Sequence, residues 1–289
     1  MSNPEPAPIR VRGRCLAWGR RTYVMSILNI TPDSFSGTGP GLDPDAALER
    51  AQRDIADGAD MLDIGGESTR PGATPVDAGT ELRRVLPVIE RLAAVPNVLI
   101  SIDTTKPEVA DAALRAGAAI LNDIHGLRGD PRMAEVAARH GAPIIAMANL
   151  RDCRYADVVE AVRCQFRESL AVAGAAGIPR DRVILDPGFG FGPPTGQNLE
   201  LIRRLRSLRE LGRPLLVGTS RKSTIGRVLD LPVEERLEGT AATVAVAIVN
   251  GVDIIRVHDT RSMVRVARMT DAIVRGWRDP EQDPDGAPV

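Results

Sequence analysis

Short apolar runs with the character of β-strands recur along the chain, and each stops at polar residues capable of chemistry. The first run, over 24–28, ends at Asn29, and the later runs end in the same way at Asp63, Asp103, Asn122 and Asp123, Asp186, Ser220 to Lys222, and Arg256 to His258. The parallel strands of a (β/α)8 barrel point their carboxyl ends at one face, where active sites of that architecture lie. The pattern therefore predicts an enzyme.

Segments with a helical period separate the apolar runs. They are expected at 45–58, 81–94, from Pro107 to just before Gly117, 131–140, 155–177, 198–211, 235–249 and 261–275. Strand followed by helix, repeated about eight times, requires right-handed crossovers and a parallel sheet. An open doubly wound sheet shows the same alternation. The number of units, and the lack of a glycine-rich dinucleotide turn after the first strand, favour a (β/α)8 TIM barrel, an α/β fold.

The chain length of 289 residues suits one barrel domain and leaves little for a second. We assign the barrel to residues 21–278. Residues 1–20 fall outside the alternation and are expected to form a cap or hairpin over the barrel floor. Residues 279–289 are rich in Pro, Asp and Gly, which predicts a mobile tail. Neither end is expected to carry chemistry.

Composition limits the classes of partner and the compartment. A formal net charge of -1 provides no general attraction for nucleic acid or for an anionic membrane, so any anion must be recognised locally. The three cysteines are widely spaced and match neither a disulfide framework nor a zinc site. The sequence has no apolar core of the signal-peptide kind and no apolar stretch long enough to span a bilayer. We therefore expect a cytoplasmic protein.

Two loops after the first strands are longer than tight connections need. Residues 29–36 and 65–72 each mix hydroxyl groups, a charge, Pro and Gly. Long loops at a catalytic face are commonly lids or binding loops. The alternative is that Thr31 to Ser34 only cap the following helix, but two such loops at one mouth favour a functional role.

Carboxylates at the ends of several strands can accept hydrogen bonds from an amino-substituted heterocycle and stabilise a cation that forms on it. Some of them could instead cap helices or pair with Lys106 and Arg221, and this alternative is favoured for Asp63 and Asp123. Asp103 and Asp186 are the stronger candidates. A loop with three glycines and two phenylalanines follows Asp186, which permits close backbone approach and ring stacking.

Basic residues after the last two strands predict an anion site. Loops in these positions of a barrel commonly bind phosphate, and Ser220 to Ser223 open a helix there. Arg256 and His258 are two residues apart on a strand and share one face. A bound phosphoryl or pyrophosphoryl group is therefore expected. The alternative is a Schiff base on Lys222, although a lysine beside an arginine at a helix start is better interpreted as an anion and carbonyl donor.

The same residues identify a family resemblance over 25 to about 277. The chain closely resembles the dihydropteroate synthases, the folate-pathway targets of sulfonamides. The resemblance is carried by the order of the motifs at 28–36, 63–72, 101–104, 122–123, 186–192, 220–223 and 256–259. It implies condensation of 6-hydroxymethyl-7,8-dihydropterin pyrophosphate with 4-aminobenzoate, giving 7,8-dihydropteroate and pyrophosphate.

The resemblance also implies roles for individual residues. The pterin ring is expected to contact Asp103, Asn122, Asp186, Phe189 and Lys222. The pyrophosphate is expected to contact Asn29, Arg70, Arg256 and His258, with Mg²⁺ held through Asn29. The aminobenzoate pocket is expected to involve Phe35, Thr69, Pro71, Lys222 and Ser223. Catalysis is assigned to Asp33, Asp103, Lys222, Arg256 and His258, and a homodimer through the last helices is implied.

The chain departs from the family pattern at two rim positions. Met147-Ala148-Asn149 stands where many relatives carry Met-His-Met, and Pro193-Pro194 stands where relatives continue with Lys. A sulfonamide-tolerant form of the enzyme is one alternative. The others are a pterin-binding methyltransferase, which has no use for a pyrophosphate pocket, and a paralogue that binds pterin without turnover.

Overall fold

The computed structural model describes residues 5–31, 44–68, 74–96, 98–151 and 153–277. Eight parallel strands form its central sheet: β3 (Tyr23–Asn29), β4 (Met61–Gly65), β5 (Leu99–Asp103), β6 (Ile120–Asp123), β7 (Ile144–Met147), β8 (Val183–Asp186), β9 (Leu216–Val217) and β10 (Ile254–Val257). The last strand, β10, pairs with both β3 and β9. A parallel bridge between Leu185 and Leu215 joins β8 to the start of β9 and closes the ring. The predicted (β/α)8 barrel is confirmed.

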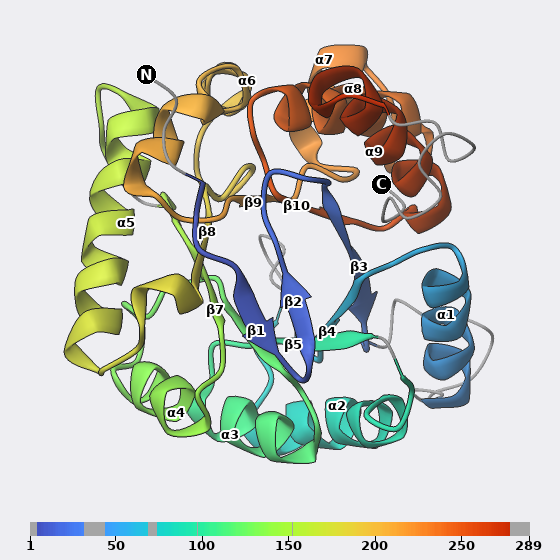
Figure 1. Ribbon diagram of the computed structural model, residues 1–289, viewed down its shortest axis with the longest axis vertical. Coiled ribbons are helices and arrows are strands. Elements are labelled where there is room, and N and C mark those ends of the chain that lie inside the picture. Colours follow the sequence, from blue (N-terminus) through green and yellow to red (C-terminus); the bar gives the residue numbers. More distant parts are fainter. Residues whose placement is uncertain (1–4, 32–43, 69–73, 97, 152, 278–289) are drawn as a thin grey trace.

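Helices surround the barrel (Figure 1). They are α1 (Pro44–Ala56), α2 (Ala78–Leu92), α3 (Pro107–Ala116), α4 (Arg132–His140), α5 (Val158–Ala175), α6 (Thr195–Arg203), α7 (Ser223–Leu229), α8 (Leu237–Val249) and α9 (Thr260–Arg275), with short 3-10 helices at Arg180–Arg182, Leu205–Leu211 and Val233–Glu235. The helix expected over 198–211 is therefore divided at Arg204, where the α-helix gives way to the 3-10 segment. Within the described residues, no helix combines the length and apolar character that a bilayer crossing requires.

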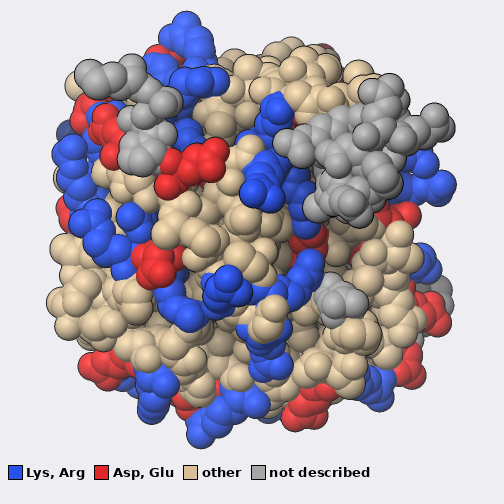
Figure 2. All heavy atoms as spheres, viewed as in Figure 1, with Lys and Arg blue, Asp and Glu red and all other residues tan. Residues whose placement is uncertain are grey.

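A hairpin closes the amino-terminal end of the barrel. Strands β1 (Ile9–Val11) and β2 (Arg14–Leu16) pair antiparallel and lie across the barrel in Figure 1. Figure 2 shows side chains filling the middle of this face. Trp18 packs edge-on against Tyr23 with ring centres 5.6 Å apart, and its Nε1 donates to the Ala7 carbonyl oxygen at 2.9 Å. The apolar floor formed in this way leaves the opposite end of the barrel for the polar residues.

The barrel interior changes from apolar to polar along each strand. Side chains two residues apart on a strand point to the same face. At the floor the inward positions are apolar, as at Met61, Leu99 and Ile120, which pack in one cluster with the hairpin. One or two inward positions further along, the residues are Asp63, Asp103 and Asn122. The strand sequences therefore place the candidate chemistry at the carboxyl ends.

Candidate active site

A salt-bridged cluster of side chains lies at the carboxyl ends of the strands. Arg256 Nε donates to Asp63 Oδ2 at 2.6 Å, and Arg256 Nη2 donates to Asp103 Oδ2 at 2.7 Å. Asp63 Oδ2 also accepts a hydrogen bond from Asn122 Nδ2 at 3.0 Å. The four side chains come from β10, β4, β5 and β6. Strands that are distant in the sequence therefore converge on one arginine.

The electrostatics of this cluster are dominated by burial. Burial raises the pKa of the Asp103 carboxyl to about 7, and the charge of Arg256 only partly opposes the shift. Burial lowers the pKa of Arg256, but the charges of Asp63 and Asp103 outweigh it and hold that pKa above its ordinary value. At neutral pH the guanidinium is therefore charged, while the Asp103 carboxyl is close to its titration midpoint.

Asp186 ends β8 and begins a glycine-rich loop that folds over it. The Gly188 amide donates to Asp186 Oδ1 at 2.8 Å. Gly188 has a φ of 69°, and a Cβ at that position would lie only 1.8 Å from the Ala148 carbonyl oxygen. Burial raises the pKa of Asp186, against the opposing charge of Lys222. Glycine therefore lets the backbone approach the chain after β7 while supplying a donor to a buried acceptor.

The ammonium group of Lys222 contacts the same loop. Lys222 Nζ donates to the Phe189 carbonyl oxygen and lies 4.5 Å from the centre of the Phe191 ring. The Arg151 guanidinium carbon lies 4.6 Å from the centre of that ring. Burial lowers the pKa of Lys222 to about 8, although the charge of Asp186 opposes the shift. Lys222 is therefore mostly charged at neutral pH, and it loses its proton as the pH rises through about 8.

His258 follows β10 and contacts the hydroxyl group of Ser220, which lies in the turn after β9. Its Nδ1 lies 3.0 Å from Ser220 Oγ, and its backbone amide donates to the same oxygen at 3.2 Å. The histidine ring is therefore held by a hydroxyl group from the neighbouring loop, on the same side of the barrel as Arg256.

One cavity of about 470 Å³ brings these groups together. Of the residues predicted from the sequence, it is lined by Asn29, Asp103, Lys222, Ser223, Arg256 and His258. Ligand pockets for small molecules usually have volumes of this order. Asn122 and Asp186 are buried close by: Asn122 pairs with Asp103 in the sheet register, and Asp186 is within charge range of Lys222 and Arg256. The cavity therefore combines buried carboxylates with the cations of Lys222 and Arg256 that lie beside them.

Some predicted residues and pairings differ from the sequence-based expectation. Asp33, Phe35, Thr69, Arg70 and Pro71 lie outside the residues that the structure describes. The ring of Phe189 does not line the cavity, because its side chain is fully buried, and Phe191 supplies the ring instead. Left-handed glycines on both sides of these phenylalanines break the strand alternation on which such an assignment depends.

The structure also shows whether the strand-end carboxylates cap helices or pair with Lys106 and Arg221. Lys106 pairs with Glu67 and Glu81 rather than with a strand-end aspartate, and Arg221 pairs with Asp259. Asp123 has a structural role, but in a turn rather than at a helix cap, because its carboxylate accepts hydrogen bonds from the amides of His125 and Leu127, ahead of α4. Asp63, for which the same alternative was favoured, accepts from Arg256 and Asn122 instead of capping a helix.

Four basic or hydroxyl side chains line the cavity although the sequence analysis gave none of them an individual role. They are Arg151, Ser220, Arg221 and Arg236. Ser220 and Arg221 lie within a motif that was recognised, so their proximity could have been inferred. Arg151 lies in the loop after β7, and Arg236 lies at the start of α8, beyond α7. No local pattern in the sequence indicates which way either side chain points.

Comparison with known proteins agrees with this geometry. The family model described as "Pterin binding enzyme" matches residues 25–258. That match covers most of the barrel. The chain belongs to the pterin-binding enzyme family.

Relatives within the pterin-binding enzymes are similar over nearly the whole chain. The dihydropteroate synthase of Bacillus subtilis is 48% identical over 266 residues, which is 92% of this chain and 93% of that protein. A dihydropteroate synthase structure from Clostridium difficile with pteroic acid aligns with a TM-score of 0.87 and 47% identity, covering 89% of this chain and 98% of that one. The structure of the Xanthomonas albilineans dihydropteroate synthase with 4-aminobenzoic acid aligns with a TM-score of 0.88 and 42% identity. The alignment covers 93% of this chain and 98% of that one.

Proposed function

We propose that the chain is a dihydropteroate synthase, a transferase of folate biosynthesis. It joins 6-hydroxymethyl-7,8-dihydropterin pyrophosphate to 4-aminobenzoate and releases pyrophosphate. The observation that carries the proposal is the single cavity where buried carboxylates face the cations of Lys222 and Arg256. The names of the similar proteins and the ligands in their structures support the same reaction.

The pterin ring is bound at the buried, acidic part of the cavity in this proposal. A pterin carries an amino group and ring N–H donors, and a carboxylate accepts such donors without supplying competing ones. Asp103, Asn122 and Asp186 are all buried there. The ring of Phe191, with Lys222 beside it, provides an apolar surface for the flat bicycle.

The pyrophosphate is bound at the cationic part, between Arg256 and His258. The bond from the pterin methylene carbon to oxygen breaks first, and its electron pair leaves with the pyrophosphate. The amine nitrogen of 4-aminobenzoate then donates its lone pair to the methylene carbon, and the new C–N bond is completed by loss of a proton from nitrogen. Arg256 stabilises the departing charge, while Asp103 stabilises the cation on the pterin.

We propose Mg²⁺ as the cofactor, held by Asn29 together with the pyrophosphate. The described part of the chain contains no group of three or more acidic, histidine or cysteine side chains suited to a metal ion. Asn29 lines the cavity, and Mg²⁺ often binds through one or two protein oxygens plus substrate phosphates. The ion would neutralise charge on the leaving group. The residues present fit an ion that arrives with the substrate.

Removal of the metal tests this assignment. We expect EDTA to abolish turnover and added Mg²⁺ to restore it, because the pyrophosphate charge is otherwise only partly compensated. The Asn29→Ala variant should need a higher Mg²⁺ concentration for half-maximal rate. An unchanged Mg²⁺ dependence in that variant would remove Asn29 from the site.

One assay distinguishes the proposed function from its alternatives. Pyrophosphate release from the pterin pyrophosphate is measured with and without 4-aminobenzoate. Release that depends on the amine, accompanied by dihydropteroate of the expected mass, supports the synthase. Pterin binding without any release would instead identify a non-catalytic paralogue.

The pKa values of Asp103 and Lys222 predict a narrow pH optimum. Catalysis needs the Asp103 carboxylate ionised, so kcat/KM for the pterin substrate should rise as the pH increases through about 7. It also needs the Lys222 ammonium, so the rate should fall as the pH increases through about 8. Initial rates at saturating aminobenzoate, measured from about pH 5.5 to about 9.5, give both the acid and the alkaline limb of the pH profile. This range extends roughly two pH units to either side of the expected optimum. Lys222→Arg should remove the alkaline limb, and a wild-type profile that is flat over this range would contradict the assignment.

We also propose that the protein is a homodimer through α7, α8 and α9. Large apolar side chains are exposed on these helices: Val228, Leu229, Val246, Val249, Met269 and Ile273. Helix α8 packs against both α7 and α9, and exposed apolar side chains on neighbouring helices commonly mark an interface. Sedimentation velocity should give the mass of two chains, and Ile273→Glu should shift the equilibrium to the monomer. A wild-type monomer at micromolar concentration would contradict the proposal.

A further inference from the structure

The turn between β9 and α7 carries two side chains of the proposed site, and its middle residue has an unfavourable backbone conformation. Ser220 contacts His258, and Lys222 contacts the glycine-rich loop. Arg221 lies between them with a φ of 56°. This left-handed conformation is uncommon for residues other than glycine, asparagine and aspartate. The directions in which the two functional side chains leave the turn depend on it.

Neighbouring residues hold Arg221 at three separate points. Its backbone amide donates to Thr240 Oγ1 at 3.1 Å, and its carbonyl oxygen accepts from Arg236 Nη1 at 3.0 Å. Its guanidinium forms a two-point pair with Asp259, from Nε to Oδ2 at 2.9 Å and from Nη2 to Oδ1 at 2.5 Å. Paired hydrogen bonds of this kind fix orientation as well as distance.

Asp259 pairs with Arg221 instead of forming the capping hydrogen bond that its position at the start of α9 would allow. It is the N-cap residue of α9, and aspartate is favoured there because its carboxylate accepts from amides of the first helical turn. Asp77 and Asp157 do this for α2 and α5. Asp259 makes no such side-chain bond. Its carboxylate is directed to Arg221, across the gap between the loops that follow β10 and β9.

We infer that Asp259 is a positioning residue, which through its pair with Arg221 holds the Ser220 to Lys222 turn in the conformation that presents Lys222 and Ser220 to the cavity. Unfavourable backbone conformations persist where the surroundings over-determine them, and they concentrate at functional sites. The inference rests on the proposed function, because it gives the turn a role in binding and turnover of the pterin substrate.

The test begins with Asp259→Ala. Without its partner, Arg221 can relax to a favourable φ and turn Lys222 away from the glycine-rich loop. We expect kcat/KM for the pterin pyrophosphate to fall about tenfold, since small displacements of positioned groups have effects of this size or larger. Affinity for 6-hydroxymethylpterin, measured by calorimetric titration, should fall with it.

A second substitution separates positioning from a general loss of structure. Glycine adopts a φ of 56° without steric cost, so Arg221→Gly removes the need for the pair. The double variant Asp259→Ala, Arg221→Gly should therefore have a higher kcat/KM than Asp259→Ala alone. Its kcat/KM should lie within about threefold of that of the Arg221→Gly single variant. If Arg221 acted by touching the substrate itself, the double variant would recover nothing.

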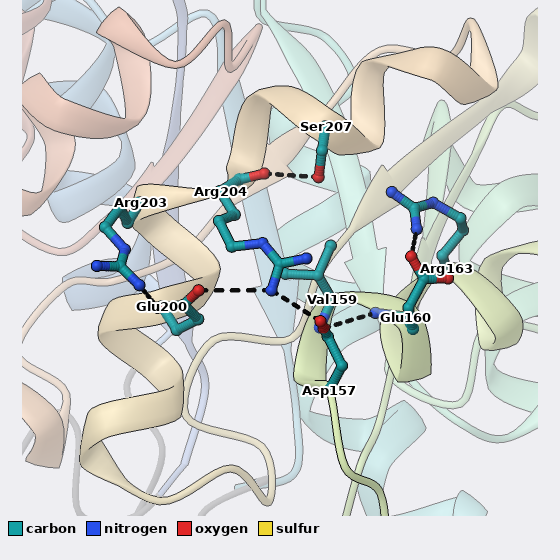
Figure 3. A network of polar contacts seen from close by, with 8 residues as sticks. All are labelled: Asp157, Val159, Glu160, Arg163, Glu200, Arg203, Arg204 and Ser207. Carbon is teal, nitrogen blue, oxygen red and sulfur yellow. Dashed lines mark hydrogen bonds and ion pairs between the residues drawn. The ribbon is translucent and has the colours of Figure 1, made fainter.

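Asp157 provides the matched control (Figure 3). It is also an aspartate at a helix N-cap and also pairs with an arginine: Oδ1 accepts from the amides of Val159 and Glu160 at 2.8 and 3.1 Å, and Oδ2 accepts from Arg204 at 2.8 Å. Asp157→Ala therefore loses a cap and an ion pair together. It should lower the melting temperature by about 2–4 °C and leave kcat/KM within about twofold of wild type.

The possible results either support the inference or overturn it. Unchanged kcat/KM in Asp259→Ala would overturn it, and so would a double variant no more active than Asp259→Ala. Should Asp259→Ala fail to fold, Asp259→Asn keeps the shape of the side chain and weakens only the charged pair, and the same rescue by Arg221→Gly is then measured in that background. If the proposed function were wrong, the wild-type protein would not release pyrophosphate in an amine-dependent way. The pterin titrations of the Asp259 variants would still test the conformation of the turn in that case.

Discussion

The Asp186→Ala variant should lose pterin binding, with kcat/KM for the pterin pyrophosphate reduced about 100-fold or more. The carboxylate is buried at the end of β8 and is held by the Gly188 amide at 2.8 Å. Its remaining acceptor capacity is available to the donor groups of a pterin. The alanine variant leaves those donors without a partner at a buried position, where an unpaired donor costs its full desolvation penalty.

The matched control for this prediction is Asp186→Asn. The asparagine oxygen can still accept from Gly188, so the melting temperature should stay near that of wild type, but the new amide donors face the donors of the pterin. We expect weak binding of 6-hydroxymethylpterin by both variants in calorimetric titrations. Normal pterin affinity in the asparagine variant would show that this carboxylate does not recognise the ring.

The Arg256→Ala variant should lose both turnover and stability. Turnover should fall about 100- to 1,000-fold, because the departing pyrophosphate loses a fixed positive charge. Stability should fall by about 3–5 kcal/mol, because removing one partner of a buried ion pair leaves uncompensated charge. Here two carboxylates, of Asp63 and Asp103, lose the same partner at once.

The stability loss in Arg256→Ala should depend on pH in a defined direction. Burial already holds the folded-state pKa of Asp103 at about 7, above its ordinary value of 3.8, and Arg256 opposes this shift. In the wild type the folded protein therefore already binds this proton more tightly than the unfolded chain does, and stability falls as the pH rises from about 4 through 7. Without Arg256 the folded-state pKa of Asp103 lies higher still, so in the variant this loss of stability continues above pH 7. Chemical denaturation at pH 5 and pH 8 should give a smaller difference from wild type at pH 5. Arg256→Lys keeps the charge, and it should recover most of the stability but less of the turnover, since lysine cannot make the two-point contact.

Much of the fold and part of the site followed from sequence patterns that are local. Polar residues that end apolar runs were placed at one end of a barrel because the direction of parallel strands fixes where those ends lie. Asp103, Arg256 and His258 line the cavity for that reason. The two-residue spacing of Arg256 and His258 was sufficient to place both on one face.

The remaining features depend on contacts between distant parts of the chain. Arg256 pairs with Asp63 and Asp103, which lie 193 and 153 residues away, and no local pattern selects among several possible acidic partners. The choice of Phe191 rather than Phe189 depends on the positive φ of the neighbouring glycines, a conformation that the alternation of a strand does not predict. Asp259 has the sequence position of a helix cap, and only the fold shows that Arg221 is its partner.

The central claim is that one cavity holds the pterin on buried carboxylates and the pyrophosphate on cations. A crystal structure with Mg²⁺ and a non-hydrolysable pterin diphosphate analogue tests it most directly. We predict hydrogen bonds from the pterin ring to Asp186, and phosphate oxygens within about 3 Å of nitrogen atoms of Arg256 and His258. A diphosphate lying away from both of these side chains, or a ring that does not contact Asp186, would contradict the account.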